Sequence, residues 1–427
     1  MAEIDLIFDR PRDRHLFGSG SKQILALDGG GVRGAITVAF LERIEAILSQ
    51  HHGKDVRLGD WFDLVGGTST GALVAGALAL GYRTTQVKDF YIHRAQTAFK
   101  RPFWRIPVFQ AKFDARALRR EIDGIVGDRE LDSEDLITGL CVVTKRMDTG
   151  SPWIIANNPR APYWETPPDE SHVGNKHYKL ANLVRASTAA PHFFDPEPLS
   201  IVEAKSKGPL DDMHAAAPDN LGLARLLTVL LARFGVRREA VFDPKTDGLF
   251  VDGGVTPHNN PSLVLFLMAI LKPYGICWPT GPDRLSITSI GTGTYRPRLA
   301  FEQLGFARLP KLAFHALLSL MSDAETLVLT LMQWLGECVT QWPINSEIGT
   351  LCDELPAGSP LFRFMRYDVR LETVWFAEKL DVKLSERDML RFRVADDPGI
   401  IADIYEIGRI AAEKQVKAEH WIGTSPK

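Results

Sequence analysis

The stretch GGTSTGALVAG, Gly66 to Gly76, places one hydroxyl residue, Ser69, between Gly67 and Gly71. An apolar run precedes this stretch, and an alanine-rich helical pattern continues it. A nucleophile in a sharp turn from strand to helix needs small neighbours, because a side chain two positions away on either side would clash with the turn. The pattern therefore predicts an exposed, activated serine at position 69. No histidine lies nearby to take its proton.

The glycine loop, residues 28–33 within LDGGGVRG, joins a short apolar run to a helical pattern. Its three consecutive glycines, Gly29 to Gly31, allow several N–H groups to point the same way, and the following helix N-terminus favours negative charge. That geometry suits a phosphate or the oxyanion of a tetrahedral intermediate, and a merely structural turn is the third alternative. No G-K-[ST] follows, and the match to G-x-G-x-x-G is loose. With the serine turn one strand later, we interpret the loop as an oxyanion hole.

The missing base must be a histidine, an aspartate or a glutamate. A serine triad of the α/β-hydrolase kind would use a histidine late in the chain, after an acidic residue. The late histidines are His258, His315 and His420. The stretch LFVDGGVTPHNNP offers a better candidate, because it places Asp252 at the end of a strand, with Gly253 and Gly254 clearing space around the carboxylate. An aspartate beside two glycines is often only a turn residue. Here the chain already contains a candidate nucleophile and oxyanion loop but no base, which favours Asp252 as the base.

Short apolar runs that alternate with helical patterns predict the scaffold. Strands and helices in alternation predict an α/β fold with a mainly parallel sheet covered on both faces. The expected strands are 23–28, 61–67, 136–144, 152–157, 248–254 and 284–294.

Composition excludes several classes of protein. The 427 residues carry a net charge of −3, which favours neither nucleic acid nor a strongly acidic partner. The four cysteines form no C-x-x-C or Cys/His cluster, which predicts reduced, buried thiols in a cytoplasmic protein and no zinc site. No secretory leader is expected at the N-terminus, and no stretch reaches 18 uncharged apolar residues. We therefore expect a soluble protein that can also lie on a membrane surface.

We expect the chain to divide into three parts. These are an N-terminal extension at 1–21, a catalytic domain at 22–300 that forms the α/β core, and a mainly helical C-terminal extension at 301–427 packed on that core. Residues 203–247 are an insertion with an amphipathic pattern, which fits a helix packed on the core, a lid over the active site or a partner-binding helix. Basic and aromatic residues mix at 99–113, which fits a surface loop or contact with an anionic membrane.

Four motifs follow one another along the chain in this order: DGGGVRG, GTSTG, RASTAAPHFF and VDGG. Together they resemble the patatin-like phospholipases, and the resemblance covers roughly residues 22–294. It implies a three-layer α/β fold and a lipid acyl hydrolase that works through a Ser-Asp dyad, without a metal or other cofactor. It also implies a phospholipid or lysophospholipid substrate and peripheral membrane contact.

The resemblance assigns roles by position. Ser69 is the nucleophile, Asp252 is its base, and the amides of Gly29, Gly30 and Gly31 line the oxyanion hole. Losing one such donor costs on the order of 3 kcal/mol in other hydrolases. The residues expected to support the site are Arg33, Gly67, Gly71, Pro191, Gly253 and Gly254.

Two alternatives share this catalytic core. An acyltransferase would pass the same acyl group to an alcohol instead of water. A regulated effector would stay inactive until a small molecule binds the C-terminal region; some bacterial members of the family that resemble this chain act in antiviral signalling, with a cyclic dinucleotide as the activator. The sequence shows no nucleotide-binding signature in that region.

Overall fold

The computed structural model describes residues 9–94, 115–190, 197–200, 247–296, 308–355 and 358–421. Pro191, the basic and aromatic stretch at 99–113 and almost all of the insertion at 203–247 lie outside the described residues. The predictions of a pocket wall, a membrane contact and a lid at these places therefore stay predictions.

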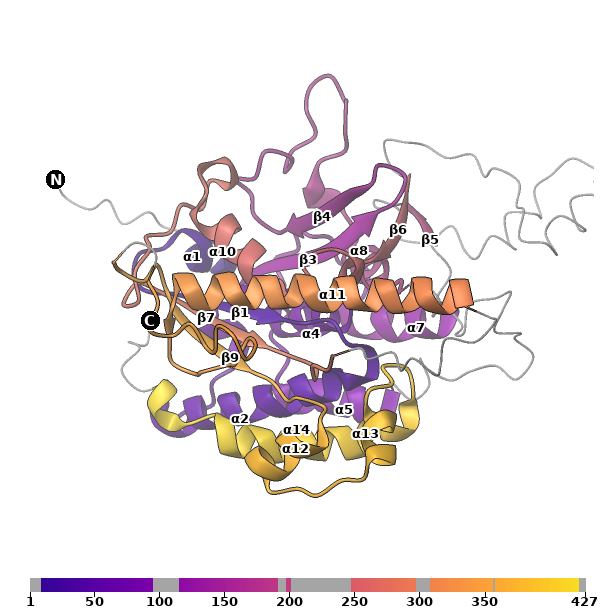
Figure 1. The fold of residues 1–427 in the computed structure, drawn as a ribbon. Coiled ribbons are helices and arrows are strands. Elements are labelled where there is room, and N and C mark those ends of the chain that lie inside the picture. Colours follow the sequence, from indigo (N-terminus) through magenta and orange to yellow (C-terminus); the bar gives the residue numbers. More distant parts are fainter. Residues whose placement is uncertain are drawn as a thin grey trace, which may run out of the picture.

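Within the described residues, nine strands form one sheet, in which eight follow the order β5-β6-β3-β2-β1-β7-β9-β8 and β4 pairs with β3 (Figure 1). Parallel pairs join β3, β2, β1, β7, β9 and β8, whereas β4, β5 and β6 add antiparallel pairs. This arrangement confirms the predicted α/β class and the mainly parallel sheet. The strands are β1 (Lys22–Leu27), β2 (Leu64–Thr68), β3 (Gly139–Arg146), β4 (Ser151–Ala156), β5 (Glu197–Ser200), β6 (Asp247–Asp252), β7 (Leu285–Ile290), β8 (Glu337–Cys338) and β9 (Arg363–Tyr367).

Helices cover both faces of the sheet, and β1 shows why they must. Its side chains alternate between two cores: Leu25 and Leu27 belong to one, Ile24 and Ala26 to the other. A strand that is apolar in both directions is stable only between two layers. The helices are α1 (Pro11–Phe17), α2 (Gly34–His52), α3 (Leu58–Trp61), α4 (Thr70–Ala79), α5 (Thr84–Asp89), α7 (Ala115–Val126), α8 (Leu180–Ser187), α10 (Ser262–Ile270), α11 (Arg308–Leu335), α12 (Thr373–Trp375), α13 (Glu386–Phe392) and α14 (Ile401–Gln415).

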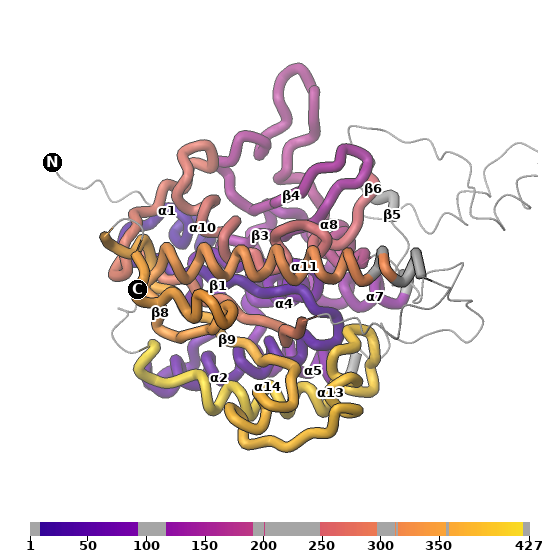
Figure 2. The backbone as a smooth tube through the Cα atoms, in the orientation of Figure 1, coloured from indigo at the N-terminus to yellow at the C-terminus, as the bar shows by residue number. Residues whose placement is uncertain are grey.

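The C-terminal region is helical, as expected, but it also belongs to the sheet. Strand β9 pairs in parallel with β7, and β8 pairs with β9. On one face α14, coloured yellow, packs along α2 (Figure 2). The long α11 lies across the opposite side and packs on α10. The C-terminal region is therefore more than an extension packed on the core, because its strands complete the sheet and its helix α14 completes one helical layer.

The four cysteines are free thiols, as the sequence predicts, but they are not all buried. Cys141 is buried in β3, whereas Cys277 is exposed and Cys338 and Cys352 are partly exposed. None of the described helices combines the length and the apolar character that crossing a bilayer requires.

Candidate active site

Ser69 occupies a strained turn between β2 and α4. Its backbone has φ 55° and ψ −125°, a conformation that costs free energy for any residue with a side chain. Both neighbouring glycines are needed for this turn. A Cβ on Gly67 would lie 2.1 Å from the carbonyl oxygen of Gly71, and one on Gly71 would lie 2.3 Å from that of Leu27. At both positions the backbone of the turn therefore leaves room only for glycine.

Sheet register brings Ser69 and Asp252 together across 183 residues of chain. Thr68, at the end of β2, pairs with Val143 on β3, and Asp252 pairs with the next residue of β3, Thr144. The serine that follows Thr68 therefore lies beside the aspartate. Its Oγ donates a hydrogen bond to Asp252 Oδ2 at 2.5 Å.

The carboxylate of Asp252 is buried and held in place. Gly254 N donates to its second oxygen, Oδ1, at 2.7 Å. A Cβ on Gly253 would lie 2.4 Å from the carbonyl oxygen of Val143, so this position accepts only glycine. Burial raises the pKa of Asp252 to about 6, against the opposing effects of the bonds from Ser69 and Gly254 and of the charge on Arg185. A carboxylate with a raised pKa is a stronger base than an exposed aspartate.

Ser187 is a residue of the site that the sequence analysis missed. The N–H of Ser69 donates to Ser187 Oγ at 2.8 Å, and this hydroxyl donates to the carbonyl oxygen of Val143 at 2.6 Å. Two residues later, the carbonyl of Ala189 accepts a hydrogen bond from the N–H of Asp252. The described part of the RASTAAPHFF motif therefore holds the backbones of both members of the pair. The hydroxyl in its RAST portion was the available signal.

The three glycines of the glycine loop differ in their surroundings. The N–H of Gly29 donates to the carbonyl oxygen of Asn259 at 3.2 Å, while a Cβ on Gly29 would lie 3.1 Å from the Cβ of Ser69. A Cβ on Gly30 would overlap the side chain of Thr292, at 2.1 Å from its Oγ1. Gly31 has φ 60°, and a Cβ there would lie 2.1 Å from the carbonyl oxygen of Ala395. Among the described residues, the N–H groups of Gly30 and Gly31 show no acceptor.

Arg33 anchors the loop and also faces a pocket. Its Nη1 donates to the carbonyl oxygen of Gly293 at 2.8 Å, and its guanidinium lies over the ring of Tyr295. This side chain therefore anchors the loop and also lines a pocket where a ligand could contact it.

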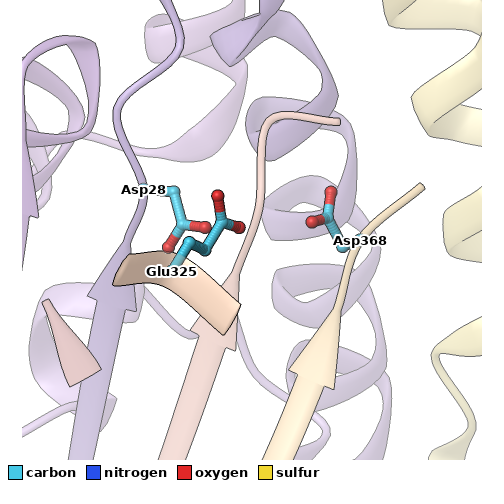
Figure 3. A group of neighbouring side chains, drawn as sticks. All are labelled: Asp28, Glu325 and Asp368. Atoms are coloured by element: carbon cyan, nitrogen blue, oxygen red, sulfur yellow. The ribbon is translucent and has the colours of Figure 1, made fainter. Parts of the chain in front are cut away.

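A buried charge cluster ties the glycine loop to the C-terminal region. Arg366 Nη2, on β9, lies 2.7 Å from Asp28, 2.8 Å from Asp368 and 3.1 Å from Glu325. Figure 3 shows these three carboxyl groups converging from the end of β1, from α11 and from the residue after β9. They are close enough to one another to hold a metal ion, but the guanidinium already bonds an oxygen of each. The geometry is that of an arginine site.

The late histidines take other places. His258 contributes its backbone: its carbonyl accepts a bond from Thr68 Oγ1 at 2.6 Å, and burial lowers the pKa of its ring. The ring of His420 hydrogen-bonds the hydroxyl of Tyr367 at 2.8 Å. His315 lies on α11. Within the described part of the chain, no histidine is bonded to Ser69 or Asp252.

The sequence also matches known proteins. A sequence model described as patatin-like phospholipase matches residues 25–266. Similar curated proteins include a cGAMP-activated phospholipase of Escherichia coli (strain TW11681), 26% identical over 57% of this chain and 63% of the relative. A cGAMP-activated phospholipase of Vibrio cholerae is 30% identical over 44% and 52%, and patatin-like protein 1 of Arabidopsis thaliana is 27% identical over 64% and 58%. The chain thus spans between about half and two thirds of the length of these relatives.

Proposed function

This chain belongs to the patatin-like phospholipase family, and we propose that it hydrolyses fatty acyl esters of phospholipids or lysophospholipids through Ser69 and Asp252. The observation that carries the proposal is the 2.5 Å hydrogen bond between the serine in its strained turn and the buried carboxylate. The glycine loop beside Ser69 supplies the third part of an acyl-transfer site.

The proposed reaction has two halves. Ser69 Oγ attacks the ester carbonyl carbon while its proton passes to Asp252, and the carbonyl oxygen becomes an oxyanion. We assign this oxyanion to the N–H groups of Gly30 and Gly31, because that of Gly29 is bonded to Asn259. The tetrahedral intermediate collapses, and Asp252 returns the proton to the departing alcohol. In the second half Asp252 takes a proton from water, the hydroxide attacks the acyl-enzyme, and fatty acid leaves as Ser69 recovers its proton.

Release of fatty acid from mixed phospholipid vesicles tests the proposed function. Wild-type protein should release fatty acid, and the Ser69→Ala protein should not. Equal release by both proteins would reject Ser69 as the nucleophile. Addition of short-chain alcohols to the same assay separates a hydrolase, which yields free acid, from an acyltransferase, which yields new esters.

The Gly30→Ala substitution should lower kcat/KM for a small ester such as p-nitrophenyl butyrate by about 10²-fold or more, the effect of losing one oxyanion donor. The added Cβ overlaps Thr292, whose Oγ1 also holds the carbonyl of Gly29, so the loop must move. Gly76→Ala on α4 is the matched control, because a Cβ there meets nothing closer than 3.9 Å. Equal activity of the two variants would argue against the assigned oxyanion hole.

The rate should depend on the ionisation of Asp252. Only the carboxylate can take the serine proton, so activity should fall as pH drops through the pKa of about 6. Between pH 5 and pH 7 the ionised fraction of such a group rises from roughly a tenth to roughly nine tenths. A profile of kcat/KM for the same ester between pH 4.5 and 8 should show this acid limb. A limb centred near pH 4, the ordinary range of aspartate, would contradict the proposed role.

We also propose that the hydrolysis is activated by a small molecule, in a cytoplasmic protein that acts at the membrane surface. The support comes from relatives whose names describe them as cGAMP-activated phospholipases, one from Escherichia coli and one from Vibrio cholerae. Purified protein assayed on vesicles with and without cyclic GMP–AMP tests this part. Full activity without the dinucleotide and no response to it would reject the dinucleotide as an activator.

A further inference from the structure

A cavity that includes neither Ser69 nor Asp252 lies between α11, the turn after β7 and the C-terminal region. It encloses about 140 Å³ and is partly open to solvent. A closed cavity of ~150 Å³ can hold a molecule the size of benzene, so there is room for a phosphate group. Asn259 forms the wall towards the active site: its Oδ1 lies 2.6 Å from the place of a Cβ on Gly29. This cavity is called the arginine pocket below.

Positive charge dominates the arginine pocket. Three arginines line it, Arg33, Arg296 and Arg370, together with two glutamates, Glu325 and Glu372. Glu325 already bonds the buried Arg366, so its charge is shared with that cluster. The remaining lining is therefore cationic. It faces a mixed side of α11, which presents Leu318, Met321 and Leu329 together with Ser322, Glu325 and Thr326.

Arg33 and Arg370 are held in place by contacts that leave some of their N–H donors without an acceptor in the described part of the chain. Arg33 lies over Tyr295, and Arg370 lies over Trp342 and donates to the carbonyl of Pro343. A guanidinium has five N–H donors, and each of these contacts uses few of them. Arg33 Nε is buried and has no acceptor among the described residues. Rigid, stacked guanidinium groups with unused donors are the groups that bind phosphate oxygens best.

Like charges meet in this pocket. Burial lowers the pKa of Arg370, and the neighbouring charge of Arg296 lowers it further, against the opposing effect of Glu372. Two guanidinium groups brought together with partial loss of water destabilise one another. An anion between them would relieve this repulsion.

We propose that the arginine pocket binds the phosphate group of a ligand through Arg33, Arg296 and Arg370. The rest of the ligand lies against Leu318, Met321 and Leu329 of α11. Because Arg33 belongs to the glycine loop, the ligand contacts the loop that lines the active site. The phosphate comes from one of two sources, a soluble nucleotide or the headgroup of a phospholipid. Both sources rest on the proposed function, because the nucleotide would be the activator proposed above and the headgroup would belong to the proposed substrate.

Binding to the full-length Ser69→Ala protein tests the proposal without any need for turnover. The probes are cyclic GMP–AMP, dihexanoyl-phosphatidylcholine below its micelle concentration, and dihexanoylglycerol, which lacks the phosphate. Isothermal titration calorimetry should show binding of at least one phosphate-bearing probe and none of dihexanoylglycerol. Adding Arg296→Gln should weaken that binding about tenfold, the size expected for loss of one charge-assisted contact.

Arg296→Gln is the informative variant, because Arg296 is exposed and forms no hydrogen bond within the described residues. The matched control is Arg391→Gln, an exposed arginine of α13 that does not line the pocket. Arg370→Gln is the second variant. Binding that is unchanged in both pocket variants, equal binding of dihexanoylglycerol, or an equal loss in the control would overturn the proposal.

The two sources give different kinetics in the wild-type background. If the ligand is a nucleotide, cyclic GMP–AMP should raise hydrolysis of p-nitrophenyl butyrate, and Arg296→Gln should shift its half-saturating concentration about tenfold. If it is a headgroup, Arg296→Gln should raise KM for dihexanoyl-phosphatidylcholine about tenfold and leave p-nitrophenyl butyrate unaffected. Failure of the proposed hydrolysis would appear as activity that survives Ser69→Ala, which leaves the binding result intact.

Discussion

Replacement of Ser69 by alanine should lower kcat/KM for ester substrates by about 10⁴-fold or more, and Asp252→Asn should do nearly the same. In the proposed reaction the serine Oγ is the atom that attacks, and no other described hydroxyl contacts Asp252 Oδ2. An asparagine keeps the shape of the aspartate but cannot accept the proton. Because the two residues act as one unit, the double variant should be no worse than the poorer single variant.

The measurement is kcat/KM with p-nitrophenyl butyrate, alongside circular dichroism to show that each variant is folded. Asp128→Asn serves as a control for loss of a carboxylate, since its side chain is 74% exposed and lies outside the site. A folded Asp252→Asn protein with more than a tenth of wild-type activity would exclude this aspartate as the base.

Arg366→Leu should lower the free energy of unfolding by about 3–5 kcal/mol, the usual cost of removing one partner from a buried ion pair. The variant leaves the carboxylates of Asp28 and Asp368 buried without their cation. Burial already raises the pKa of Asp28 well above its usual range, against the effect of Arg366. Without the arginine that pKa rises further, so the deficit should be largest at neutral pH and shrink as acid protonates the group.

Urea denaturation at pH 7 and pH 5 measures this loss. Arg363→Leu, on the same strand but partly exposed, is the matched control and should cost less than about 1 kcal/mol. If Arg366→Leu does not fold, Arg366→Lys keeps the charge but loses the guanidinium, whose Nη2 reaches three carboxylates and whose Nη1 donates to Ser289. Its free energy of unfolding should lie between those of wild type and Arg366→Leu. Equal midpoints for Arg366→Leu and Arg363→Leu would show that the cluster contributes nothing.

Local pattern was enough for the strands at the centre of the sheet, because an apolar run such as Ile24 to Leu27 can only be a buried strand or part of a helix. Local pattern did not predict the strand β9, because the two arginines in its sequence RFMRY are typical of an exposed segment. Arg366 is buried because its carboxylates come from positions 28, 325 and 368, which no window along the chain contains.

The site shows the same division. Ser69, Asp252 and the glycines stand out because only small residues fit the turns beside them, and that constraint is visible in the sequence. The N–H of Gly29 is engaged because it donates to the carbonyl of Asn259. Ser187 can hold the backbone of Ser69 because its hydroxyl also donates to Val143 on β3. Both are contacts between distant segments. The run of three glycines and the hydroxyl of the RAST portion can be read in the sequence, but neither specifies the residue that it contacts.

The bond between Asp28 and Arg366 spans 338 residues, and this has a consequence for the order in which the molecule is made. On the ribosome, Ser69 and Asp252 both emerge long before β9, so the reacting pair can meet in a nascent chain. The glycine loop cannot reach its final form then, because Arg366 and Ala395 have yet to be synthesised. A growing chain therefore holds Ser69 and Asp252 beside an unfinished glycine loop until residues 366 and 395 have been synthesised.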